Sequence, residues 1–425
     1  YKTPLIKYNN FNLNSIILGS ILFLIVRLLI WAQFDFAALL ETGDDKYYID
    51  VAKNIINYGT HVSGDLYSGR PPGYPFFLAV LLKLNIEIIT INIYIIQSVI
   101  LFVTYLISFF IIQKTRPRAA VLFFLILCLL PFDAVYNGRV LSENLLTPLV
   151  LISTVLLLFQ YKSKFFGYIL PGILLGLVTL VKDIFLLLPF LIAIYMIFNK
   201  ANLKYVVIFL LAYSSTVSPW IIRNASLPSD NFIGISKGIF WTNLWVGTWL
   251  QGDLAYSSAA QRGFIEKNEI ELFVEKRQNM STEQDFFRDQ ALNNLIHKPF
   301  QVIGNWAYRV PKMWIGTRTD LFQMRFETRS LYWYVSKLFY FGANLVIILL
   351  FLALVTVGIM KREKAAYLSL VFTLYLLFIY MPFYNIETRY SQPVFSVMLL
   401  YIALSDFIIK NLFKNTKNLL YRKKE

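Results

Sequence analysis

The sequence predicts an all-α polytopic membrane protein with about ten transmembrane helices, a surface helix in its first outer loop and a small α-rich outer subdomain. Two observations lead to this fold class. The 425-residue chain is 57% hydrophobic and only 15% charged, whereas soluble domains carry about 25% charged residues. Its apolar residues also form runs of roughly 17–25 residues, the length that a helix needs to cross the hydrocarbon core of a bilayer.

Ten apolar runs follow one another along the chain, and each predicts one transmembrane helix. They lie at residues 12–34, 87–113, 119–133, 141–160, 165–181, 184–199, 204–222, 336–360, 365–382 and 391–410. The connections at 114–118, 162–164, 200–204 and 361–364 are rich in Lys and Arg, and so is the C-terminal tail. By the positive-inside rule these segments, and with them both termini, are expected in the cytoplasm. The net charge of +15 then reflects the basic segments that face the cytoplasm and does not indicate nucleic-acid binding.

The remaining connections are expected on the opposite, extracytoplasmic face. Two of them are long, at about 35–86 and 223–335. We therefore divide the chain into a transmembrane core (1–222) that contains the first outer loop (35–86), an outer segment or subdomain (223–335), and C-terminal transmembrane helices with a basic tail (336–425). The abundance of Ile, Asn and Lys is typical of an AT-rich bacterial genome, which favours the inner (plasma) membrane.

The first outer loop begins with an acidic pair, Asp44 and Asp45, in ETGDDKYYID (41–50). From there the apolar residues follow the spacing of one helix face as far as Ile56, which predicts a short amphipathic helix on the membrane surface. Tyr58-Gly59 is expected to end it. Acidic residues at a helix N-terminus can simply cap the helix and interact with its dipole, so this pair by itself does not establish a functional site.

The same loop returns to the membrane through GRPPGYP (69–75). Its three prolines fix the backbone in an extended turn, which brings Arg70 back to the membrane surface. Proline-rich turns also often do no more than start a helix. Each feature is common alone, but an acidic pair followed about 25 residues later by a rigid turn that carries an arginine is a less common combination. The combination therefore points to a functional site more strongly than either feature does.

These motifs resemble the first extracytoplasmic loop of the GT-C glycosyltransferases, in particular the protein O-mannosyltransferases and the lipid A aminoarabinose transferases. The likeness starts from ETGDDKYYIDVAKNIINYG and SGRPPGYPFFLAVL. It continues in NGRVLSENLLTPL (137–149), GLVTLVKDIFLLLP (176–189), SPWIIRN (218–224) and ETRYSQPVF (387–395), whereas residues 225–330 match only loosely.

The resemblance implies an integral-membrane inverting glycosyltransferase that moves a sugar from a polyprenyl-phosphate donor to a hydroxyl or phosphate of a glycan, lipid or protein acceptor outside the cytoplasm. The phosphate that leaves is weakly basic, so the reaction needs a base for the acceptor and cations for the phosphate rather than a strong acid. By its match to the family motif, Asp44 is the candidate base. Asp45 is expected to tune it, to position the acceptor, or to share a divalent cation with it, although no cofactor is expected to be required.

Five basic residues near the outer ends of the apolar runs are candidates to bind the donor phosphate, because arginine in particular stays charged and matches phosphate geometry. They are Arg70, Arg139, Lys182, Arg223 and Arg389. Such residues can also merely extend their charged ends to the interface. The residues expected to shape the donor and acceptor sites are Tyr48, Tyr74, Glu143, Glu387 and Tyr390.

Other functions are less well supported by the sequence. A transporter or flippase for lipid-linked saccharides is expected to show inverted repeats and broken helices at the midplane, and a polymerase or ligase of such saccharides is a further alternative. Two histidines are too few to suggest a histidine-based zinc site, and one cysteine, Cys128, excludes an intramolecular disulfide. Trp241, Trp245 and Trp249 share a helix face, which predicts either an interfacial belt or a surface that stacks on a sugar.

Overall fold

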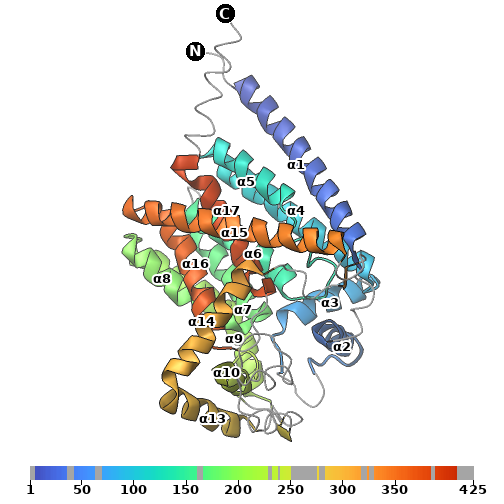
Figure 1. The fold of residues 1–425 in the computed structure, drawn as a ribbon, viewed down its shortest axis with the longest axis vertical. Coiled ribbons are helices and arrows are strands. Elements are labelled where there is room, and N and C mark those ends of the chain that lie inside the picture. Colours follow the sequence, from blue (N-terminus) through green and yellow to red (C-terminus); the bar gives the residue numbers. More distant parts are fainter. Residues whose placement is uncertain are drawn as a thin grey trace, which may run out of the picture.

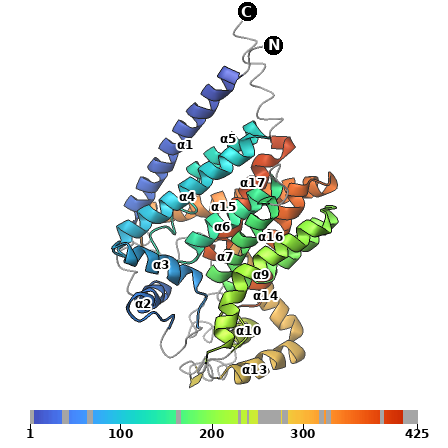
Figure 2. The same cartoon turned by 180° about the vertical axis from the view of Figure 1, so that it is seen from behind.

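The computed structural model describes residues 5–35, 43–62, 69–159, 166–227, 232–237, 240–249, 275–276, 283–316, 323–324, 330–383 and 388–408. Apart from one antiparallel pairing of two-residue strands, β1 (Phe34–Asp35) with β2 (Gln323–Met324), the regular elements in these ranges are helices. Figures 1 and 2 show them from opposite sides. The predicted all-helical class is confirmed.

A helix fills each of the ten predicted apolar runs. They are α1 (Leu5–Gln33), α4 (Thr90–Gln113), α5 (Pro117–Leu129), α6 (Glu143–Leu158), α7 (Phe166–Val181), α8 (Leu188–Phe198), α9 (Leu203–Ala225), α15 (Leu331–Met360), α16 (Lys364–Tyr380) and α17 (Gln392–Leu404). In the described ranges, four helices are long and apolar enough to cross a membrane: α1, α4, α9 and α15. The protein is thus a membrane protein, and the full count of about ten crossings stays a prediction.

The bundle is organised around α17. All thirteen residues of this helix are buried, and it packs against α5, α6, α15 and α16. In contrast, α1 exposes large apolar side chains such as Leu24 and Leu28. Exposed leucines suit a surface that faces lipid, where burial against another helix has no hydrophobic advantage.

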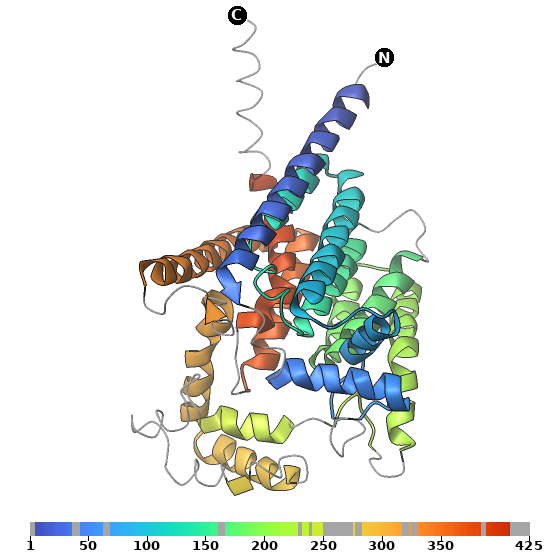
Figure 3. The ribbon, with the colours of Figure 1, turned by 90° about the vertical axis from the view of Figure 1, so that its right-hand side faces the viewer.

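The first outer loop contains α2 (Gly43–Tyr58) and α3 (Gly73–Lys83). The predicted amphipathic helix is confirmed: Tyr48, Val51 and Ala52 are buried. The helix ends where expected, because Gly59 adopts φ +67°, a conformation that stops a helix and that glycine accepts without strain. Helix α2 lies crosswise to the long helices α1 and α4 (Figures 1 and 3).

Three helices of the 223–335 segment lie at the end of the molecule opposite to the start of α1 (Figure 1). They are α10 (Phe240–Trp249), α13 (Gln284–His297) and α14 (Pro299–Ile315). Trp245 is fully buried and packs on Phe287, with ring centres 5.5 Å apart. The two surface roles expected for this tryptophan are therefore wrong, because its ring belongs to the interior of this group of helices.

Candidate active site

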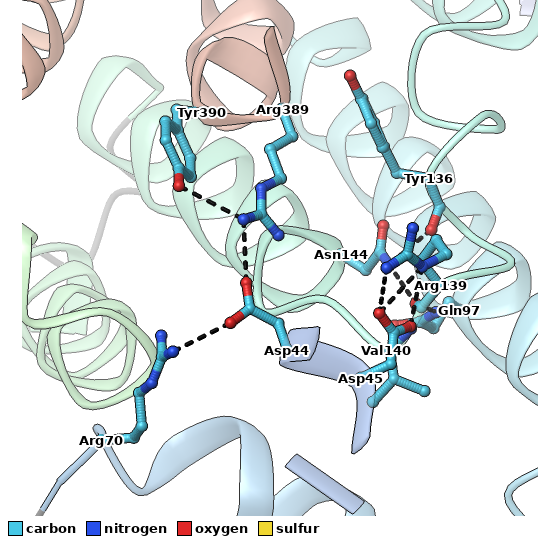
Figure 4. Close-up of polar contacts among 10 residues, drawn as sticks. All are labelled: Asp44, Asp45, Arg70, Gln97, Tyr136, Arg139, Val140, Asn144, Arg389 and Tyr390. Carbon is cyan, nitrogen blue, oxygen red and sulfur yellow. Dashed lines mark hydrogen bonds and ion pairs between the residues drawn. The ribbon is translucent and has the colours of Figure 1, made fainter. Parts of the chain in front are cut away.

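Asp44 joins three segments that are far apart in the sequence. It lies in the first turn of α2, and one carboxylate oxygen accepts a hydrogen bond from Arg70 Nη2 at 3.0 Å. The other oxygen accepts from Arg389 Nη2 at 2.9 Å (Figure 4). Arg70 comes from the proline-rich turn before α3, and Arg389 comes from the short 3-10 helix η4 (Thr388–Ser391) that precedes α17.

Close packing of α3 on α7 holds the proline-rich turn in place. Pro71 and Pro72 are buried, and α3 begins at Gly73. A Cβ atom on Gly73 would lie 2.7 Å from Val181 Cγ2 and 2.9 Å from the Val181 backbone nitrogen. Only glycine allows this approach, so the RPPG sequence places Arg70 next to the end of α7.

The two arginines set the charge state of Asp44. Burial by itself would raise the pKa of this carboxyl, but Arg70 and then Arg389 outweigh that effect and lower the pKa from 3.8 to about 2. Asp44 is therefore a carboxylate at neutral pH, and it is held by two guanidinium groups.

A second ion pair lies beside the first. Lys182 directly follows α7, and its ammonium group donates to Glu143 at the start of α6. The Lys182 Nζ also lies 4.4 Å from the ring centre of Tyr390, which stacks on Tyr380 with ring centres 4.4 Å apart. Burial lowers the pKa of Lys182 from its usual 10.5, and the Glu143 carboxylate opposes this effect.

Tyr390 connects the two ion pairs. Its hydroxyl oxygen lies 3.4 Å from Arg389 Nη2, and the Arg389 guanidinium carbon is 5.1 Å from the centre of its ring. Three of the five predicted phosphate-binding residues, Arg70, Lys182 and Arg389, thus gather around one acid and one aromatic ring. Glu143 and Tyr390, which were expected to shape the site, are part of the same group.

Asp45 has a different environment from its neighbour. Its side chain is completely buried, and both carboxylate oxygens accept from Arg139 Nε at 3.0 Å. Arg139 Nη2 and the Val140 backbone N–H, the latter at 2.7 Å, also donate to it. Consecutive helix residues project about 100° apart, so this pair lies apart from the Asp44 carboxylate (Figure 4). The geometry favours a structural role for Asp45 and Arg139 over the roles expected from the sequence.

Sequence reasoning missed two buried amides that hold Arg139. Gln97 Nε2 donates to the backbone oxygens of Asn137 and Arg139 at 2.8 and 3.0 Å, and Asn144 Nδ2 also donates to the Arg139 oxygen at 3.0 Å. Gln97 Oε1 accepts from the Tyr74 hydroxyl at 2.9 Å. A signal for Gln97 was available, since a polar residue within an apolar run of this length usually has a specific partner.

The other predicted site residues have varied surroundings. Tyr48 is buried and meets Tyr74 edge-on with ring centres 5.0 Å apart. Burial raises the pKa of Tyr48 to about 12. Arg223 donates to its neighbour Asn224 at 2.7 Å and lies over Trp220, so these contacts are within its own helix. Glu387 lies outside the described residues.

The arginine contacts also bear on the divalent cation considered for Asp44 and Asp45. Both oxygens of each carboxylate accept from arginine, so a cation that bridged them would have to displace these contacts. In the part of the chain that the structure describes, no group of three or more His, Cys, Asp or Glu side chains could hold a metal ion. Arginines lie beside both carboxylates, and guanidinium groups bind anionic oxygens. The site therefore suits an anion better than a cation.

Comparison with known proteins finds similarity in structure. The chain matches the archaeal oligosaccharyltransferase AglB from Archaeoglobus fulgidus, solved with an inhibitory peptide and a dolichol-phosphate, with a TM-score of 0.56 and 13% identity. The match covers 96% of this chain and 51% of AglB, so this chain spans about half the AglB length. ArnT from Cupriavidus metallidurans, bound to undecaprenyl phosphate, matches with a TM-score of 0.38 and 13% identity over 93% of this chain and 79% of ArnT.

The match to AglB, at this identity, shows a shared fold. It confirms the GT-C fold that the sequence motifs implied. No protein-family model matches the chain, and no curated protein matches its sequence.

Proposed function

We propose that this protein is an inverting glycosyltransferase that moves a sugar from a polyprenyl-phosphate donor to an acceptor hydroxyl. One observation carries the proposal: a carboxylate, Asp44, lies between Arg70 and Arg389 with a third cation, Lys182, beside them, in a membrane protein. The fold shared with AglB, an oligosaccharyltransferase solved with a dolichol-phosphate, supports it.

The arrangement contains the groups that this reaction needs. Asp44 accepts the proton of the acceptor hydroxyl, whose oxygen forms a bond to the anomeric carbon of the sugar. The bond from that carbon to the phosphate oxygen breaks, and its electron pair stays with the phosphate. Arg70, Arg389 and Lys182 stabilise the negative charge that develops there. A single displacement with one carboxylate inverts the anomeric centre, whereas retaining glycosidases use two carboxylates about 5 Å apart.

The proposal includes the setting of the reaction. The enzyme resides in the inner (plasma) membrane, with the site on the extracytoplasmic face and both termini in the cytoplasm, as the basic loops indicate. Its partners are the polyprenyl-phosphate sugar, membrane lipids and a glycan, lipid or protein acceptor, with no nucleic acid. No cofactor is required.

Mass spectrometry of the lipids that co-purify with the protein tests the proposed function. Asp44→Asn removes the base but keeps the shape of the side chain, so we expect a polyprenyl-phosphate sugar to accumulate on this variant and not on the wild type. Asp50→Asn, which removes a charge from the exposed face of the same helix, is the control and should behave as the wild type. A lipid-linked oligosaccharide on all three proteins would contradict the proposal and favour a flippase or a polymerase.

A further inference from the structure

The arginines proposed to bind the donor phosphate are already paired in this structure. Each oxygen of Asp44 accepts from one of them, at 3.0 Å from Arg70 and 2.9 Å from Arg389. The Arg389 side chain is only 8% exposed, so it has little room to turn toward a second anion. The Asp44 and Arg70 side chains are 26% and 43% exposed and have more freedom to move. A phosphate that reaches this pair of arginines must therefore compete with the carboxylate.

We propose that Asp44 is the resident counter-ion of the phosphate site, and that the donor phosphate displaces it from Arg70 and Arg389 and so frees the carboxylate to act as the base. This inference rests on the proposed function and adds an order of events to it. The donor binds first, and the acceptor is activated only afterwards. Without a donor, the same carboxylate is kept from accepting a proton.

The surroundings of Asp44 give the physical reason. The charged groups that act on it are Arg70, Arg389 and Lys182, and all three lower its pKa while burial raises it. Tyr48, on the same helix, is neutral because its pKa is raised to about 12. When a phosphate replaces the carboxylate as the partner of the arginines, they no longer lower the pKa of Asp44 to the same extent. The effect of burial remains, and the pKa of Asp44 rises. A carboxylate with a higher pKa is a better general base near neutral pH.

The charges also balance through the reaction. Before transfer, Asp44 and the phosphodiester of the donor each carry one negative charge. Afterwards Asp44 holds the proton of the acceptor and is neutral, and the polyprenyl phosphate is a monoester that can carry two negative charges. The total negative charge beside the arginines is therefore the same before and after transfer. One negative charge has moved from the carboxylate to the phosphate.

The test measures binding of a phosphodiester that does not titrate between pH 4.5 and 8, the methyl ester of a polyprenyl phosphate. Its Kd is determined for the wild type, Asp44→Asn and the control Asp50→Asn in lipid nanodiscs across that pH range. We expect Asp44→Asn to bind roughly tenfold more tightly than the wild type at pH 7, because its arginines are no longer occupied by a charged carboxylate. Asp50→Asn should match the wild type.

The pH dependence of binding, measured for the wild type and for Asp44→Asn, tests whether the bound phosphate raises the pKa of Asp44. If the phosphate raises the pKa of Asp44, binding takes up a proton, so wild-type affinity must increase as the pH falls. The affinity of Asp44→Asn should then lack this increase. A wild-type affinity that is independent of pH, together with equal or weaker binding by Asp44→Asn, would overturn the displacement while leaving phosphate binding in place. Failure of both proteins to bind the probe would overturn the proposed function as well.

Discussion

Two adjacent acids at the start of α2 lie in different environments. Asp44 is partly exposed and shared by two arginines from different segments, whereas Asp45 is fully buried in a closed pair with Arg139. A buried charge that has lost its partner is costly, while a partly exposed carboxylate can exchange partners. Under the proposed function, the same residue type thus serves chemistry at one position and structure at the next.

This contrast predicts different effects of the same substitution. Asp45→Asn leaves the Arg139 guanidinium buried without its counter-charge, so we expect the free energy of unfolding to fall by about 3–5 kcal/mol. Asp44→Asn should lower the transfer rate by orders of magnitude with a smaller loss of stability, because Asp44 is itself partly exposed and Arg70, one of its two partners, is 43% exposed. Thermal unfolding in detergent and the turnover of the folded fraction measure the two effects. A stable Asp45→Asn protein without activity would assign a catalytic role to Asp45 after all.

Arg389 should act mainly on the donor. Arg389→Ala removes a nearly buried guanidinium group that is proposed to bind the donor phosphate. We therefore expect the apparent affinity for the donor to fall roughly tenfold or more, in line with the strength of charge-assisted hydrogen bonds. Steady-state kinetics with varied donor concentration gives this value. Arg223→Ala is the comparison, because Arg223 contacts Asn224 and Trp220 of its own helix instead. An equal loss for both variants would mean that neither effect is specific to the Asp44 site.

At the scale of elements, the contact between α3 and α7 sets the position of Arg70. Gly73→Ala would place a methyl group 2.9 Å from the backbone nitrogen of Val181, which cannot turn away as a side chain can. We expect a loss of about 1–3 kcal/mol in stability and a several-fold drop in turnover, because Arg70 shifts with the start of α3.

Gly304→Ala in α14 is the matched control for that substitution. A Cβ atom there would meet nothing within 4 Å, and alanine favours a helix over glycine by up to about 1 kcal/mol. Stability and turnover should therefore be kept or slightly improved. If Gly73→Ala behaved in the same way, the close approach of α3 to α7 would not be what positions Arg70.

At the scale of the whole molecule, the site lies toward one end of the bundle. The start of α1 and the end of α17 lie at the opposite end from α2 and α10 (Figure 1). Five segments build the site: α2, the turn before α3, the start of α6, the end of α7, and η4 before α17. A site at one rim of the bundle suits a substrate whose tail lies in the bilayer and whose sugar lies in water.

The predicted orientation can be tested by labelling cysteines in intact cells. Cys128, the only cysteine of the chain, is buried and can be replaced by serine. Asp50→Cys on the exposed face of α2 should then react with an impermeant maleimide from outside. Lys361→Cys, exposed between α15 and α16, should react only after the membrane is permeabilised. The reverse pattern would place the site in the cytoplasm.

The sequence by itself determined where the helices form and which residues to suspect. The ten apolar runs, the amphipathic helix that ends at Gly59 and the RPPGYP turn are local patterns, and local patterns depend on periodicity, length and backbone preference. The motifs that resemble those of the GT-C glycosyltransferases are local patterns too, and they pointed correctly to a GT-C fold.

Only the tertiary structure decided which charge pairs with which. Arg70 and Arg389 lie 26 and 345 residues from Asp44 in the sequence, yet both contact it. Arg139, a similar arginine by sequence, instead pairs with Asp45. These choices follow from how α3 packs on α7 and how η4 precedes the buried α17. Such packing depends on contacts between distant segments, which no local pattern encodes.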